Sequence, residues 1–217
     1  MKNTNIIGIS GKHGSGKDTV AVIFQLIPFM PDDEALLRAL DDPKLITNVQ
    51  ATSEWKVKKF ASKLKQIASI LTGIPIEKFE DQDFKNSRLG PEWFETKPYV
   101  AGVVNVSNPM TVRTFLQRLG TDAMRIGLHE NTWVNALAAD YEPGCKWLVT
   151  DVRFKNEAKM LKDTGALLVR VDRNVDTGDH PSEVDLDDYK FDVVLDNSGS
   201  LLNLVKQVRA LYQILNK

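Results

Sequence analysis

Five short segments along the chain have the length and pattern of β-strands. Four are mostly apolar runs and one alternates apolar with polar residues, which is typical of buried and half-buried strands respectively. They cover residues 5–10, 55–60, 146–151, 167–172 and 191–196. Helix-like segments separate them, and this alternation predicts an α/β fold with one five-stranded parallel sheet covered by helices on both faces.

The helical segments are recognised by apolar residues that recur every three or four positions. The first should end before Pro28, because proline disfavours helix in the residue ahead of it. Residues 111–124 form the clearest amphipathic helix, and Ser200 can cap a closing helix. A further helix, ending at Gly73, places four apolar residues at helical spacing: Leu64, Ile67, Ala68 and Leu71.

Two stretches interrupt the alternation. Residues 28–54 are acidic and polar, and they predict a surface insertion with one short helix. Residues 73–110 are rich in turn residues and aromatics. Segments of this length are usually lids or binding segments, and the aromatic side chains argue against disorder.

A glycine-rich turn joins the first strand to the first helix. The sequence GKHGSGK, from Gly11 to Lys17, fits the G-x-x-x-x-G-K phosphate loop. Backbone N–H groups of such a loop converge on a phosphate, the lysine neutralises its outer oxygens, and the helix dipole favours the same anion. We therefore expect nucleotide phosphates to bind at Gly11, Gly14, Ser15, Gly16 and Lys17.

The phosphate loop departs from its usual pattern at the position that serves Mg²⁺. A hydroxyl residue normally follows the lysine, whereas this chain has Asp18 there and Thr19 one place later. A carboxylate beside a triphosphate is repulsive unless a metal lies between them or the side chain turns away. A second acidic residue, Asp151, ends the strand 146–151, where phosphate-loop proteins order the magnesium shell. We expect Mg²⁺ at Asp151 with either Asp18 or Thr19.

Candidate substrate contacts lie on two helices. Lys65 follows the strand 55–60, at the end of a strand where open α/β sheets bind ligands; the alternative is a solvated lysine. Arg113 and Gln117 share one helix flank, where a guanidinium suits phosphate and an amide suits a base edge. The alternative for this pair is a surface interaction that supports the helix.

Composition limits the class of protein. The 217 residues are 42% hydrophobic and 26% charged, with a formal charge of −1, so no excess of basic residues is present to bind a nucleic acid polymer. No apolar run is long enough for a membrane helix, and the first residues do not have the pattern of a signal peptide. With its single cysteine, Cys145, the chain is expected in the cytoplasm.

Several stretches together resemble the bacteriophage deoxynucleoside monophosphate kinases, a branch of the phosphate-loop nucleotide kinases. They are SGKHGSGKDT, FASKLK, VRTFLQRLGTD, TDVRFKNEAKMLKDTGALLVRV and DHPSEVDLDDYKFDVVLDNSGSL. The form GKDT is itself similar to this family. The resemblance implies a P-loop NTPase fold in a single kinase domain, residues 1–217. Insertions at about 61–133 would bind the acceptor, and a lid at about 172–186 would close over ATP.

The resemblance implies transfer of the γ-phosphate of ATP to a deoxynucleoside 5′-monophosphate, with Mg²⁺. Positive charge around the transferring group would then come from Arg153, Arg170 and Arg173, since arginine matches phosphate oxygens bidentately. Asn197 would border the adenine ring, and His180 would anchor the lid rather than act as a base, because an ionised phosphoryl acceptor needs none. The acceptor would meet Lys65, Arg113 and Gln117, with Asp122 and Trp133 as further candidates.

Two other functions are compatible with the same loop. A kinase of another small phosphorylated metabolite, such as phosphomevalonate, shares the ATP half and differs in the acceptor pocket. A nucleotide-dependent switch needs no second substrate, but the arginines argue against it, and no N-K-x-D segment for guanine is present. We expect small-molecule partners, and neither a nucleic acid polymer nor a membrane. The sequence is compatible with a homodimer. If the protein is viral, it would work in the host cytoplasm.

Overall fold

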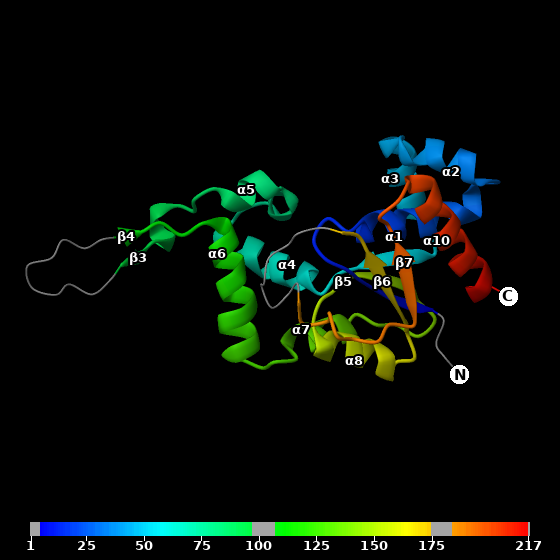
Figure 1. Cartoon of the computed structure of the whole chain (residues 1–217). Coiled ribbons are helices and arrows are strands. Elements are labelled where there is room, and N and C mark those ends of the chain that lie inside the picture. Colours follow the sequence, from blue (N-terminus) through cyan, green and yellow to red (C-terminus); the bar gives the residue numbers. More distant parts are fainter. Residues whose placement is uncertain (1–4, 97–106, 175–183, 217) are drawn as a thin grey trace, which may run out of the picture. The chain divides into compact units, whose positions relative to one another are not determined.

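The computed structural model describes residues 5–96, 107–174 and 184–216. The chain divides into two compact units (Figure 1). Unit 1 consists of residues 1–60 and 137–217, and unit 2 of residues 61–136. In the described part of the chain, no helix is both long and apolar enough to span a bilayer.

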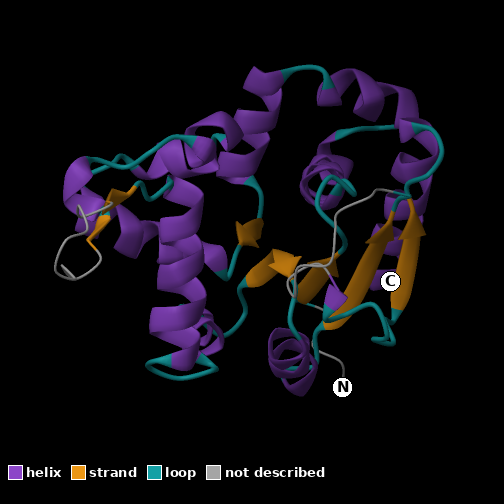
Figure 2. Cartoon of the chain, turned by 60° about the vertical axis from the view of Figure 1, so that its left-hand side comes forward, coloured by secondary structure: helices purple, strands orange, loops and turns teal. Residues whose placement is uncertain are grey.

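Unit 1 is built on a parallel sheet. Its strands are β1 (Ile6–Ser10), β2 (Trp55–Lys58), β5 (Lys146–Val152), β6 (Leu167–Asp172) and β7 (Val193–Asp196), in the order β2-β5-β1-β6-β7. Figure 2 shows strands as orange arrows with purple helices around them. All four pairings are parallel, which confirms the predicted five-stranded parallel sheet. Because the strands run in one direction, their carboxyl ends meet at one edge, with β1 in the middle.

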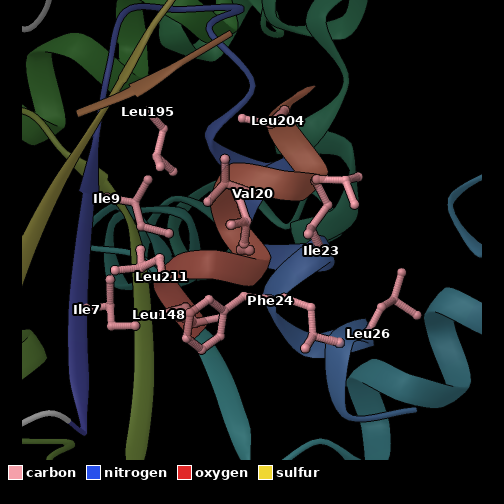
Figure 3. Packing of buried hydrophobic residues seen from close by; sticks show 14 of the residues in the cluster. Ile7, Ile9, Val20, Ile23, Phe24, Leu26, Leu148, Leu195, Leu204 and Leu211 are labelled. Atoms are coloured by element: carbon pink, nitrogen blue, oxygen red, sulfur yellow. The ribbon is translucent and has the colours of Figure 1, made fainter. Parts of the chain in front are cut away.

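Helices cover both faces of this sheet. On one face, Ile7 and Ile9 of β1 pack against α1 (Lys17–Leu26) and α10 (Leu201–Leu215), and Phe24 of α1 belongs to the same cluster (Figure 3). On the other face, Gly8 leaves room for Leu161 of α8 (Lys155–Asp163), whose side chain would lie 2.7 Å from a Cβ at that position. Side chains alternate across a strand, so consecutive β1 residues serve opposite layers.

The segment 28–54 is part of the core, and its assignment as a surface insertion is wrong. After a short 3-10 turn (Ile27–Phe29) it forms two helices, α2 (Asp33–Leu40) and α3 (Pro43–Thr52), each capped by an aspartate at its N-terminus. Leu36, Ala39 and Val49 are buried in the same cluster as α1 and α10. The apolar residues of this segment recur at helical spacing, whereas its acidic residues lie near the ends of the two helices and are mostly exposed.

Unit 2 has its own hydrophobic core. It begins with α4 (Ala61–Thr72) and continues through η2 (Ile76–Glu80), α5 (Gln82–Asn86), η3 (Pro91–Trp93) and the short antiparallel strands β3 (Glu95–Thr96) and β4 (Ser107–Asn108). The buried residues of its main cluster are Ala68, Phe79, Leu89, Val112, Phe115 and Leu119. The segment 73–96 thus contributes Phe79 and Leu89 to this core, whereas Leu71, expected on the apolar stripe, is half exposed.

The predicted helix 111–124 is not regular along its length. It consists of α6 (Val112–Gln117), capped by Thr111, followed by the wider π-helix η4 (Arg118–Ile126). Gly120 lies in this wider part, where the indole N–H of Trp133 donates to its carbonyl oxygen at 3.0 Å. Trp133 belongs to α7 (Thr132–Ala138). A side-chain donor that inserts among the backbone hydrogen bonds of a helix is a known cause of local irregularity.

Candidate active site

The phosphate loop follows the central strand and has the backbone conformation that its glycines permit. Gly16 has φ of +98°, and Gly14 has φ of +76°, both in the left-handed region that favours glycine. A Cβ at Gly11 would lie 2.5 Å from the carbonyl oxygen of Val171 in β6. Ser15 is fully buried, and its hydroxyl has no hydrogen-bond partner among the described residues. An unpaired buried donor beside a helix N-terminus fits a phosphate-binding loop.

Three of the predicted cationic residues meet at this loop. Lys17 donates from Nζ to the carbonyl oxygens of Gly11 at 2.6 Å and Lys12 at 2.7 Å. Arg173, just after β6, reaches the carbonyl oxygen of Gly14 at 3.4 Å. Arg170, on β6, donates to the hydroxyl of Ser10, the last residue of β1, at 3.4 Å. Lys17 and Arg173 thus place positive charge on the loop, and Arg170 places it at the end of β1, where the loop begins.

A carboxylate that the sequence did not single out also lies here. Asp187 accepts from Arg170 Nη2 at 2.9 Å, and its second oxygen is 3.7 Å from Lys12 Nζ. The guanidinium of Arg170 also lies over the ring of Phe191, 5.7 Å from the centroid. Arg170 is therefore held in place by a carboxylate and an aromatic face. Asp187 comes from an acidic run that looks like solvated surface in sequence, so no local signal identifies it.

The neighbours of Asp187 attach the same segment to α8. Asp185 accepts from the backbone N–H of Lys155 at 2.7 Å, and Asp188 lies 3.0 Å from Lys155 Nζ. The hydrogen bond from Lys155 and its positive charge lower the pKa of the Asp188 carboxyl, and the same contact raises the pKa of Lys155. Residues 185–188 are thus fixed at the carboxyl edge of the sheet.

Two predicted metal ligands have neighbours at the carboxyl edge of the sheet, Asp18 from the first turn of α1 and Asp151 from near the end of β5. Asp18 Oδ1 accepts from the hydroxyl of Thr150 at 3.1 Å and is 3.0 Å from Lys59 Nζ. Asp151 Oδ1 accepts from the backbone N–H of Phe60 at 2.8 Å. Among the described residues, no group of three or more His, Cys, Asp or Glu side chains could hold a metal ion by itself. Two carboxylates with nearby hydroxyls fit Mg²⁺, which usually keeps waters and phosphate oxygens as its other ligands.

Arg153 is positioned by the start of α8. Its backbone N–H and that of Phe154 donate to Glu157 Oε2, at 2.8 and 3.1 Å. Glu157 is buried, so its carboxylate fixes the turn from β5 into the helix. The sequence did not single out Glu157 as the partner of these N–H groups. A glutamate at the third position of a helix is nevertheless a known capping signal.

Asn197, expected beside the adenine ring, contacts the phosphate loop itself. Its side-chain amide donates to the carbonyl oxygen of Ser15 at 2.8 Å, and its backbone N–H donates to the backbone carbonyl oxygen of Asp172 at 2.7 Å. A Cβ at Gly16 would lie 2.5 Å from the same amide nitrogen. Asn197 thus supports the conformation of the loop, and its contact with adenine stays a prediction.

The predicted acceptor residues lie in unit 2 and differ in their surroundings. Lys65, only 13% exposed in its side chain, pairs with Glu80 at 2.5 Å, while Arg113 donates to Asn86 Oδ1 at 3.0 Å. Arg113, Gln117 and Asp122 are exposed, whereas Trp133 is buried with its indole N–H bonded. Their roles as substrate contacts stay predictions. In the predicted lid, His180 and Glu183 lie outside the described residues.

The fold and the site together define a phosphate-loop nucleotide-binding protein. The sheet is parallel, and the phosphate loop follows its central strand. Cations contact that loop, and a carboxylate lies near the end of the neighbouring strand. Residues 47–208 match the model of the family described as deoxynucleotide monophosphate kinase. This match covers more than half of the chain, and the chain belongs to that family. The matched range begins beyond the phosphate loop, which is recognised by its own sequence and geometry.

Individual viral proteins are similar to the chain over most of its length. A protein of Acanthamoeba polyphaga mimivirus, provisionally named a deoxynucleotide monophosphate kinase, is 26% identical over 94% of this chain and 93% of its own. The deoxynucleoside-5′-monophosphate kinase of Escherichia phage T5 is 27% identical over 82% of this chain and 83% of its own. The deoxynucleotide monophosphate kinase of Escherichia phage RB69 is 28% identical over 55% and 53%.

Membership of this family makes the chain a phosphotransferase that acts on small-molecule substrates, deoxynucleoside monophosphates, and a kinase family implies ATP as the phosphate donor. It favours the nucleotide kinase over the two alternatives that the sequence left open, a kinase of another phosphorylated metabolite and a nucleotide-dependent switch.

Proposed function

We propose that the chain transfers the γ-phosphate of ATP directly to the phosphate of a deoxynucleoside 5′-monophosphate, at the phosphate loop of unit 1. An oxygen of the acceptor phosphate forms the new bond to phosphorus while the bond to the β–γ bridging oxygen breaks, giving a deoxynucleoside diphosphate and ADP. The observation that carries the proposal is that Lys17 and Arg173 contact the loop and Arg170 contacts Ser10, the residue directly before it. Phosphoryl transfer depends mostly on positioning and positive charge.

Each cationic residue has a defined part in this step. Lys17 and the loop N–H groups hold the β- and γ-phosphates, and the hydroxyl of Ser15 has a hydrogen bond to give there. Arg153, Arg170 and Arg173 stabilise the charge on the transferring group. No general base is needed, because the attacking phosphate oxygen is already ionised at neutral pH.

The metal site of the proposal consists of Asp18 or Thr19 together with Asp151. A magnesium ion bound there would neutralise phosphate oxygens and orient the triphosphate. The hydrogen bonds that Asp18 and Asp151 accept from Thr150 and Phe60 fix one oxygen of each carboxylate before any ligand binds. Such positioning lowers the cost of assembling the site.

The acceptor is proposed to bind to Lys65, Arg113 and Gln117, with Asp122 and Trp133 nearby, within one kinase domain whose region 61–133 forms the acceptor side. The lid is proposed at 172–186. For Lys65 the substrate phosphate would replace Glu80, an exchange of one anion for another. Nucleic acid polymers are not proposed as partners, a homodimer is compatible with the proposal, and the protein is proposed to work in the cytoplasm.

The test is ADP release from ATP and Mg²⁺ with dAMP, dCMP, dGMP and dTMP, the ribonucleotides and phosphomevalonate as acceptors. We expect turnover with at least one deoxynucleotide, and loss of turnover in Lys17→Ala. Lys44→Ala, an exposed lysine of α3, is the matched control and should keep the parent rate. Activity with phosphomevalonate alone, or with no acceptor, would contradict the proposal.

A further inference from the structure

Asp18 has two partners on the neighbouring strand ends that the family pattern does not explain. The Nζ of Lys59, directly after β2, lies 3.0 Å from Asp18 Oδ1, and the Thr150 hydroxyl of β5 donates to the same oxygen at 3.1 Å. β2 and β5 are adjacent in the sheet, with Lys58 opposite Val149. An ammonium and a hydroxyl therefore converge on one carboxylate oxygen, where the usual phosphate loop has a hydroxyl of its own.

The charge at this position has to be compensated in two different states. A triphosphate beside Asp18 meets a like charge whenever no divalent cation is present. The ammonium of Lys59 supplies the missing positive charge in that state. Once a divalent cation binds between the carboxylate and the phosphates, the cation supplies this positive charge instead. The cation and the Lys59 ammonium therefore compete for the same oxygen, Asp18 Oδ1.

The pair is weak enough to be exchanged. The side chain of Asp18 is 71% exposed and that of Lys59 is 30% exposed, and ion pairs accessible to water change an equilibrium by about fivefold or less. A doubly charged cation held also by phosphate oxygens can replace a single ammonium under these conditions. Thr150 is buried and keeps its position on β5 in either case.

We propose that Lys59 is a positioning residue that holds Asp18 Oδ1 towards β2 and β5 in the absence of metal and yields this oxygen to the divalent cation when the metal–nucleotide complex binds. Lys59 then determines how strongly nucleotide binding depends on the metal. The inference rests on the proposed function, namely that the phosphate loop holds the nucleotide together with Mg²⁺, and of the two residues proposed there for the metal it takes Asp18 rather than Thr19.

The readout is the affinity for the β,γ-imido analogue of ATP, measured by calorimetry with Mg²⁺ and again with EDTA. For Lys59→Met we expect affinity to fall about fivefold in EDTA and to stay within about twofold in Mg²⁺, since an exposed pair has about this effect. Lys59→Arg keeps the charge and should preserve the parent ratio of the two affinities.

Two controls separate this role from a general effect of charge. Lys58→Met removes the same charge one residue away, where the ammonium lies over the Trp147 ring, and it should leave the ratio unchanged. In an Asp18→Asn background the Lys59→Met effect in EDTA should disappear, because coupling between contacting residues is lost when either is removed.

Three results would overturn the proposal. Equal weakening with and without Mg²⁺ would make Lys59 a simple phosphate contact. No change in either condition would remove any role for it, and an effect that persists in Asp18→Asn would show that it does not act through Asp18. Absence of nucleotide binding in the parent protein would instead refute the proposed function, and this inference with it.

Discussion

Replacing Leu36 by alanine tests whether the acidic segment 28–54 belongs to the core. Leu36, on α2, is fully buried in the cluster formed with α1 and α10. The change removes three carbon atoms at about 0.8 kcal/mol each, and the cavity adds a further cost of about 24 cal/mol per Å³. We therefore expect the free energy of unfolding to fall by about 3 kcal/mol.

The assay is urea unfolding followed by tryptophan fluorescence and by hydrogen exchange of peptides from α2 and β1. With a slope of about 2–3 kcal/mol per molar urea, the midpoint should fall by about 1–1.5 M. The control is Leu201→Ala, the same substitution at a position of α10 that is 41% exposed, with an expected loss below about 1 kcal/mol. A loss for Leu36→Ala no larger than that of the control would show that 28–54 is a surface insertion.

Three further changes test the site and its surroundings. Gly16→Ala should weaken ATP binding at least tenfold in a calorimetric titration with little loss of secondary structure, because alanine is strained at φ of +98° and its Cβ would displace Asn197; unchanged affinity would contradict the loop geometry. Arg113→Ala should raise the KM for the deoxynucleotide at least tenfold and leave the KM for ATP within about twofold, and an equal rise in both would refute its assignment to the acceptor. Asp188→Asn should lower the thermal unfolding temperature at neutral pH, because a carboxylate whose pKa is lowered in the folded state stabilises the fold only while it is ionised. The difference from the parent should diminish as the pH falls from the ordinary carboxyl pKa of 3.8 and vanish once the pH is below the lowered pKa of the folded state; a difference that stays constant across this range would contradict this origin.

Local patterns were sufficient to predict the sheet and the nucleotide site. Four apolar runs and one alternating segment became the five parallel strands, and the end of α1 ahead of Pro28 followed from the restriction that proline places on its neighbour. The sequence from Gly11 to Lys17 predicted a phosphate loop because its chemistry depends on consecutive residues, whose backbone conformations and spacing are written locally.

Partnerships between distant residues were decided only by the tertiary structure. Lys59 and Asp187 reach the phosphate loop from separate segments, and nothing near them in sequence marks them as its neighbours. The alternation of strands and helices implies a parallel sheet but leaves the order of its strands undetermined. That order, with β2 beside β5 and β1 in the centre, determines which strand ends meet at the loop.

The segment 28–54 shows the same limit for the core. Its composition is acidic, and composition alone indicated an exposed insertion. Only the packing of α2 and α3 shows that a few apolar side chains, Leu36, Ala39 and Val49, are buried against α1 and α10. The sequence by itself determined the local elements and the chemistry of consecutive residues, whereas long-range packing decided which of them share a core or a site, since burial depends on the surfaces that distant segments present to one another.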